Sequence, residues 1–177
     1  MPSRVIGPGP VTKQTLADLI TVGIAEGDTL DYKRAINVET PKAKLELCAD
    51  VASFANSFGG EIVFVMNEDG NAKAKELMPL TGFSKDSIER QFRQILNAYA
   101  DPPIPGLRFE EVELSPGASA LVLRIPRSWN RPHSVQGNPP AFPIRDGSNK
   151  RNMKVRELRE AFGLSESISA RMKRFRS

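Results

Sequence analysis

Residues 52–70 read ASFANSFGGEIVFVMNEDG, and this stretch decides the fold. Its first residues continue a predicted helix over 41–57, on which Leu45, Cys48 and small alanines recur on one face at helical spacing. Two consecutive glycines, at 59 and 60, end that helix. Residues 61–66 are nearly all apolar, which predicts a buried strand, and residues 67–70 predict its turn. The stretch therefore predicts a helix with a face of small residues that packs closely against a sheet.

The segments on either side predict further helices and strands without regular repetition. In chain order they are a helix capped by Thr12, a strand over 30–34, a helix that begins at Ser84 or Asp86, a hairpin of 109–114 and 120–126, and a strand over 141–145. This interleaving favours an α+β domain in which helices pack on a mixed β-sheet. We expect a flexible Gly/Pro-rich leader over residues 1–11, one domain over 12–155, and a basic C-terminal pair of helices over 156–177.

Composition excludes several classes of protein. No apolar run approaches the roughly 20 residues that a membrane helix needs, and the N-terminal residues do not resemble a secretory signal. The single cysteine, Cys48, excludes an internal disulfide framework and a Cys-rich zinc site. We therefore expect a cytoplasmic protein.

Positive charge is concentrated at the C-terminal end. The chain has a formal net charge of +4, and residues 145–177 hold ten Lys/Arg against four Asp/Glu. Residues 156–162, Gly163 and residues 165–175 predict a helix, a turn and a second helix, and the second presents Arg171, Lys173 and Arg174. This arrangement favours contacts with nucleic-acid phosphates. The alternatives are a solvated basic tail, a helical cover for the sheet edge, or a dimer contact.

Five short motifs follow one another within residues 15–155. They are Glu26 with Asp31-Tyr32-Lys33, Phe54-Ala55-Asn56 with Gly59-Gly60, the apolar strand that leads to Asp69-Gly70, Pro132-His133, and Ile144-Arg145-Asp146-Gly147-Ser148. In this order they resemble the Schlafen-type AlbA-like domain. The resemblance implies a compact α+β domain that binds nucleic acid, either DNA or structured RNA, in a regulator or a defence system. A module that assembles homo-oligomers is a further alternative.

The resemblance also implies a possible reaction. In the Schlafen branch a related core cuts RNA with three acidic residues, two of which correspond to Glu26 and Asp31. The third position falls near Glu68 and Asp69, of which we choose Asp69. Such carboxylates can hold Mg²⁺ or Mn²⁺, so a metal-dependent endoribonuclease is the alternative function. This chain departs from the family pattern in two places: Asp31 replaces the more usual Glu, and Val65 stands where Gly is usual.

Several cations near these motifs are candidates for contacts with phosphate. They are Lys33, Arg34, Arg145, Lys150 and Arg151. Arginine suits bidentate phosphate contacts, and backbone N–H groups around Gly147 can add to them. In the alternative interpretation, Lys33 and Arg145 neutralise the domain's own carboxylates, and Asp31 pairs with one of them across the sheet.

Two unusual residues lie in the Pro-rich segment after the hairpin. We expect Trp129 to be a partly buried anchor for this segment, with stacking on a base of a single strand as the alternative. We expect His133, the only histidine, to pack there and to bond to the backbone, with a role as general base as the alternative.

Overall fold

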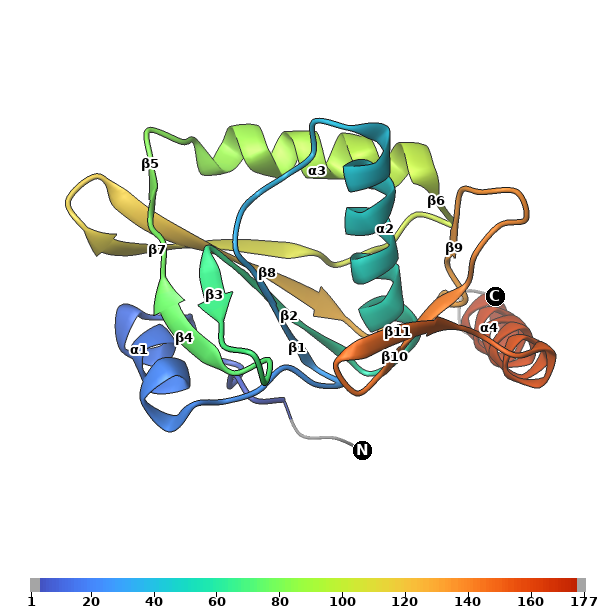
Figure 1. The fold of residues 1–177 in the computed structure, drawn as a ribbon. Coiled ribbons are helices and arrows are strands. Elements are labelled where there is room, and N and C mark those ends of the chain that lie inside the picture. Colours follow the sequence, from blue (N-terminus) through green and yellow to red (C-terminus); the bar gives the residue numbers. More distant parts are fainter. Residues whose placement is uncertain (1–3, 175–177) are drawn as a thin grey trace.

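The computed structural model describes the backbone of residues 4–174 and the side chains of residues 4–166. In chain order its helices and strands are α1 (Lys13–Val22), β1 (Leu30–Lys33), α2 (Pro41–Asn56), β2 (Gly59–Phe64), β3 (Met66–Glu68), β4 (Ala74–Leu77), β5 (Leu80–Thr81), α3 (Lys85–Tyr99), β6 (Ala100–Asp101), β7 (Arg108–Ser115), β8 (Ala118–Pro126), β9 (Ser134–Val135), β10 (Pro143–Asp146), β11 (Asn149–Asn152) and α4 (Val155–Arg174). The predicted α+β class with a mixed sheet is confirmed (Figure 1). Within the described residues no helix is long and apolar enough to cross a membrane.

A five-stranded sheet forms the centre of the domain. β1 runs parallel to β2, whereas β2, β5 and β7 are all antiparallel to β8. Three pairs of short strands lie outside this sheet: β3–β4, β6–β9 and β10–β11. The mixture of parallel and antiparallel pairs follows from the chain order, because α2 connects the parallel strands and a tight turn connects β7 to β8.

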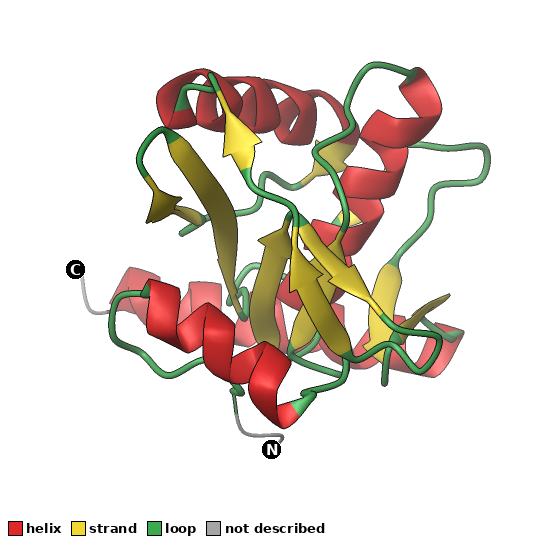
Figure 2. Cartoon of the chain, turned by 60° about the vertical axis from the view of Figure 1, so that its left-hand side comes forward, coloured by secondary structure: helices red, strands yellow, loops and turns green. Residues whose placement is uncertain are grey.

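Both faces of the sheet are covered, which explains why β2 is apolar almost throughout. On one face Ile62 and Phe64 of β2 pack with α2 and α3 in the larger hydrophobic cluster. On the other face Val63 packs with α1 in a second cluster. Figure 2 shows the strands between the helices of the two sides. The residues of β1 alternate in the same way: Leu30 and Tyr32 belong to the second cluster, so Asp31 and Lys33 face the α2 side.

Two backbone positions fix the path of β2. Gly59 has φ 75°, and a Cβ atom there would lie 2.6 Å from the backbone nitrogen of Arg127, so only glycine fits. Val65, directly after β2, is 1% exposed and has φ 63°, a left-handed conformation that is unusual for a β-branched residue. Glycine adopts this conformation without strain, which agrees with the expectation that glycine is usual at this position.

The N-terminal residues differ from the expected flexible leader. Ile6 is 2% exposed and belongs to the second cluster. Arg4 pairs with the buried Glu61 at 3.1 Å, and Arg124 donates to the carbonyl oxygens of Gly7 and Gly9 at 2.8 and 2.5 Å. The described residues of this segment, 4–11, therefore pack against the sheet, where they supply further polar partners to the buried charged groups Glu61 of β2 and Arg124 of β8.

The C-terminal appendage also differs from the expectation. The predicted pair of helices is a single helix, α4, that continues through Gly163. A Cβ atom at Gly163 would meet nothing within 4 Å, so the position is open. A glycine there costs the helix only about 1 kcal/mol relative to alanine, which is too little to break it.

Candidate functional site

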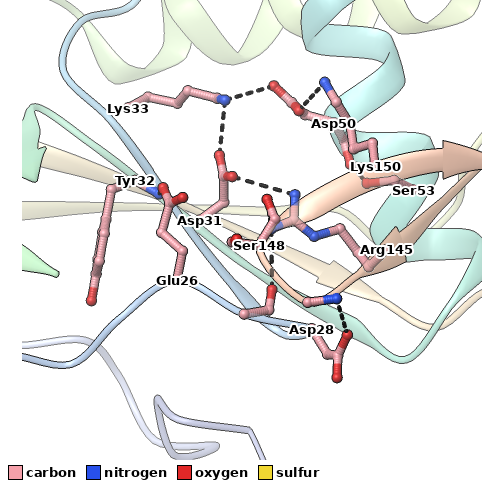
Figure 3. A network of polar contacts seen from close by, with 12 residues as sticks. Glu26, Asp28, Asp31, Tyr32, Lys33, Asp50, Ser53, Arg145, Ser148 and Lys150 are labelled. Atoms are coloured by element: carbon pink, nitrogen blue, oxygen red, sulfur yellow. Dashed lines mark hydrogen bonds and ion pairs between the residues drawn. The ribbon is translucent and has the colours of Figure 1, made fainter. Parts of the chain in front are cut away.

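Six side chains of alternating charge connect β1, α2 and the β10–β11 hairpin, and Figure 3 shows most of them. This ion-pair network consists, in order of contact, of Glu46, Lys150, Asp50, Lys33, Asp31 and Arg145. Lys33 Nζ lies 3.0 Å from a carboxylate oxygen of both Asp50 and Asp31. Lys150 Nζ lies 2.5 Å from the other oxygen of Asp50, and Lys150 also contacts Glu46. Three acids and three bases leave the network with no net charge.

Arg145 is the most deeply buried cation of the network, with a side chain that is 1% exposed. Its guanidinium lies 3.3 Å from Asp31, donates to the carbonyl oxygens of Gly27 and Ser148 at 3.1 and 3.3 Å, and stacks 4.5 Å from the centre of the Phe54 ring. It therefore points into the domain rather than toward a ligand. The interpretation in which Arg145 neutralises the domain's own carboxylates is the one that the geometry matches.

Lys33 also forms ion pairs within the domain, with Asp31 and Asp50. Burial by itself lowers the pKa of Lys33, but the charges of Asp50 and Asp31 outweigh burial and raise that pKa above its usual value. The side chain is one third exposed, so its amine borders solvent while it holds two carboxylates. Lys150 has the same position between Asp50 and Glu46. Neither lysine is a free cation.

The three acids predicted for a metal site do not come together. The Glu26 carboxylate accepts a hydrogen bond from the backbone N–H of Tyr32 at 2.7 Å. Burial raises the pKa of Glu26 to about 7, and the nearby charges of Asp31 and Glu68 add to this rise. Asp69 instead accepts the backbone N–H groups of residues 71 and 73 at 2.7 and 3.1 Å, within its own turn, and these bonds lower its pKa. From this segment, the charge that acts on Glu26 is that of Glu68 rather than that of Asp69.

These side chains do not fit a divalent cation as they stand. In the described part of the chain no three Asp, Glu, His or Cys residues lie close enough to hold a metal ion. The Asp31 carboxylate is already held by Lys33 and Arg145, and Asp69 is held by its own turn. We therefore derive no metal-dependent step for the Mg²⁺ or Mn²⁺ that the nuclease alternative requires.

The remaining predicted cations are dispersed. Arg34 is exposed just beyond β1, and the structure gives it no ion pair within the described residues. Arg151 is held between Asp146 at 3.4 Å and Glu157 at 2.8 Å, and its hydrogen bonds lower the pKa of Glu157 to about 2. Arg171, Lys173 and Arg174 belong to the part of α4 whose side chains lie outside the described residues.

Two motif residues hold the β10 strand onto α2. Asn56, at the end of α2, donates through its side-chain amide to the carbonyl oxygens of His133 and Pro143 at 2.9 Å each, and accepts the His133 backbone N–H at 2.7 Å. The His133 ring is fully buried, with Nδ1 2.7 Å from the carbonyl oxygen of Pro102, and burial lowers its pKa. His133 thus packs in the Pro-rich segment, as expected. The motif residues Asn56, His133, Asp31 and Arg145 together fix the hairpin to the domain.

A surface hollow of about 570 Å³ lies where the end of α2, the loop after β8, the β10–β11 hairpin and α4 meet. Its charged lining residues are Asp28, Arg127, Arg131, Arg145, Asp146, Arg151, Glu157 and Glu160. We call it the arginine hollow. The β10–β11 hairpin and α4 that border it lie at one end of the molecule in Figure 1.

Most charges in the arginine hollow are already matched. Asp146 and Glu157 pair with Arg151, and Glu160 pairs with Arg156 of α4. The Asp28 carboxylate accepts the backbone N–H of Gly147 at 2.9 Å. These contacts, together with the pairing of Arg145 and Asp31, leave two arginines of the lining without a carboxylate.

These two are Arg127 and Arg131, and within the described residues neither forms an ion pair. Burial lowers the pKa of Arg131, and the neighbouring charge of Arg127 lowers it further, so the two cations repel each other. The loop that carries them is anchored by Ser128, which is 1% exposed and whose backbone N–H donates to the carbonyl oxygen of Ala55 at 2.9 Å. The sequence analysis did not identify Arg127 as a candidate for phosphate contacts. The signal available for it was the pattern Arg-Ser-Trp-Asn-Arg at residues 127–131, directly after an apolar strand.

Trp129 lies between these arginines in the same loop. Trp129 is 49% exposed, so it is partly buried, as expected. Ser128, which is 1% exposed, anchors the loop, and about half of Trp129 stays at the surface.

Of the comparisons with known proteins, the family model agrees with the expected family. Among curated proteins none matches this chain. A crystal structure of the DIP2311 protein from Corynebacterium diphtheriae is similar at 17% sequence identity and a TM-score of 0.48; the match covers 80% of this chain but 30% of that one. The family model for Schlafen, AlbA_2 matches residues 26–154, which include all five motifs from Glu26 onward. This chain belongs to the Schlafen AlbA_2 family.

Proposed function

We propose that this domain binds nucleic acid and that Arg127 and Arg131, in the arginine hollow, make the phosphate contacts. The observation that carries the proposal is the pair of adjacent, mutually repelling arginines without a carboxylate partner among the described residues. A phosphate between them relieves this repulsion and accepts bidentate hydrogen bonds from guanidinium groups. Family membership supports the same function.

The proposal places the contacts away from the ion-pair network. Lys33, Arg145 and Lys150 already neutralise carboxylates at 2.5–3.3 Å. A phosphate that bound them would have to displace those carboxylates from partly or fully buried positions, at a cost in desolvation. The network instead positions the β10–β11 hairpin, which forms one wall of the arginine hollow.

The salt dependence of binding tests the proposal. The affinity for a labelled oligonucleotide, measured by fluorescence anisotropy, should fall steeply as salt rises. Arg127→Ala and Arg131→Ala should each reduce the slope of log K against log salt by about 0.7–0.9, the value of one phosphate contact. Arg90→Ala is the matched control, since Arg90 is exposed on α3, away from the hollow. Slopes unchanged in both hollow variants would contradict the proposal.

The same samples separate binding from catalysis. Gel analysis of transfer RNA incubated with the protein and Mn²⁺ should show intact RNA. Cleavage that Glu26→Gln abolishes would replace binding by a nuclease as the function of this domain. We use Glu26 for this variant because, among the described residues, its carboxylate accepts one backbone N–H and forms no ion pair, so we expect the fold to tolerate glutamine.

A further inference from the structure

Three aromatic residues are exposed in the described part of the chain, and one of them lines the arginine hollow. Among the aromatic residues whose exposure is described, the exposed ones are Phe58, Trp129 and Phe162, at 38%, 49% and 48%. Phe58 lines the hollow, and Trp129 belongs to the loop whose arginines line it. Phe162 lies on α4 and packs edge-on against Phe142 at 6.3 Å. Phe58 and Trp129 have no such aromatic partner in the described part of the chain.

The backbone holds Phe58 beside Arg127. In the antiparallel pairing of β2 with β8, Gly59 is opposite Pro126. The next residues of the two segments, Phe58 before β2 and Arg127 after β8, therefore lie side by side where the pairing ends. Both residues line the hollow. A side chain at Gly59 would collide with the backbone of this loop at 2.6 Å, so the close approach of the two segments is built into the fold.

The position of Trp129 is fixed by its neighbours. Ser128 is buried and its backbone N–H is bonded to Ala55, while its side-chain oxygen accepts the backbone N–H of Asn130 at 3.1 Å. Arg131 donates to the Ser128 carbonyl oxygen at 3.3 Å. These bonds close a tight turn. The half-exposed Trp129 stands in the sequence between Arg127 and Arg131, which form no ion pair within the described residues.

We propose that the bound ligand is single-stranded nucleic acid, with bases stacked on Trp129 and Phe58 and phosphates held by Arg127 and Arg131. This inference rests on the proposed function and names its substrate class. In a duplex the base faces are covered by neighbouring bases, whereas a single strand offers a free face to an exposed aromatic ring. Aromatic rings interleaved with cations are the arrangement that tracks a single strand, since every base has a face to stack and every nucleotide carries a phosphate.

The decisive comparison uses two probes with the same charge. One is a labelled oligothymidine, and the other is an abasic oligonucleotide of equal length, which has the phosphates without the bases. We expect the wild-type protein to bind oligothymidine about five- to 150-fold more tightly, the effect of one stacked base. Trp129→Ala should remove most of this difference and leave the affinity for the abasic probe unchanged. Phe58→Ala should act in the same direction.

Matched controls separate stacking from damage to the fold. Phe162→Ala removes an equally exposed aromatic ring outside the hollow lining and should leave both affinities unchanged. Trp129→Phe should keep part of the preference for bases. Because Trp129 is the only tryptophan of the chain, its fluorescence reports stacking directly: oligothymidine should quench it, and the abasic probe should not.

Each outcome decides something. Equal affinity for the two probes, or tighter binding of a duplex of the same length, would overturn the single-strand proposal and leave the phosphate contacts of the proposed function intact. Absence of salt-dependent binding to all three probes would overturn the proposed function itself. Tight binding of oligothymidine with unchanged tryptophan fluorescence, and with full affinity in Trp129→Ala and Phe58→Ala, would also refute stacking at these two residues.

Discussion

Replacing Arg145 by methionine separates a structural arginine from a ligand-binding one. Methionine keeps the unbranched apolar part of the side chain but removes the charge and the guanidinium that stacks on Phe54. The Asp31 carboxylate, 6% exposed, then has Lys33 at 3.0 Å as its remaining cation. The carbonyl oxygens of Gly27 and Ser148 lose their donor at the same time.

The expected loss of stability follows from these contacts. Breaking a buried ion pair by removing one partner costs about 3–5 kcal/mol. The remaining contact with Lys33 places the expected loss near the lower end, about 3 kcal/mol. For a chain of this size a loss of that order lowers the melting temperature by roughly 6–12 °C. If Arg145 served only a ligand, its replacement would change the free energy of unfolding by about 0.5 kcal/mol or less, as for other surface positions.

Urea unfolding of a double-mutant cycle measures the pair itself. The four proteins are the wild type, Arg145→Met, Asp31→Asn and the double variant. We expect the double variant to be more stable than the sum of the single losses predicts, by about 1–3 kcal/mol, because the two side chains share one contact. Arg34→Met is the control, since Arg34 is exposed and unpaired among the described residues. Additive losses, or a loss in Arg145→Met no larger than in the control, would refute the reasoning.

Further predictions concern buried groups outside the arginine hollow. Burial raises the pKa of Glu26 from 4.5 to about 7, so as pH rises this carboxyl ionises in the unfolded chain before it ionises in the folded one. The free energy of unfolding of the wild type, measured with urea, should therefore fall between pH 4.5 and 7. Glu26→Gln should remove that fall. The pKa of His133 is lowered from 6.5, so the fold should lose stability as pH falls through that value, and this opposite trend should emerge in the Glu26→Gln protein. Val65→Gly should change the free energy of unfolding by less than about 1.5 kcal/mol, because relief of the left-handed strain offsets lost burial, whereas Val63→Gly in β2 should cost about 3–4 kcal/mol. Cys48, fully buried and with its pKa raised to about 12, should react with a thiol reagent only as fast as the chain unfolds; fast labelling of the native protein would show that this helix face is open.

Local signals in the sequence were sufficient for the main elements. Thr12 caps α1 as predicted, and Ser84, one of the two predicted starts of α3, caps that helix. The apolar run after Gly59 forms the central strand β2. Six short strands were not predicted, since two to four residues carry too little periodicity to be recognised: β3, β4, β5, β6, β9 and β11. The single C-terminal helix was also missed, because one exposed glycine is a weak helix breaker whose effect neighbouring residues can outweigh.

The candidate site was only partly accessible from the sequence. The motif order was sufficient for the family, and the family model confirms it. The motifs did not show the roles of individual cations, because Arg145 and Asp31 are 114 residues apart and their contact exists only in the folded chain. For Asp69 the difficulty was similar: Glu68 and Asp69 are adjacent in sequence, and only the folded turn shows that the Asp69 carboxylate accepts backbone N–H groups.

The amino-acid sequence by itself determined the alternation of buried residues, the glycines that permit close approach, the family and the total charge. The tertiary structure alone decided which charges remain available to a ligand. Charged side chains neutralise each other over a few ångströms, and water and salt screen them beyond that distance. The same number of arginines and carboxylates can therefore give either a network that neutralises itself or a surface with unpaired cations. Which of the two forms depends on the side chains that the fold brings into contact.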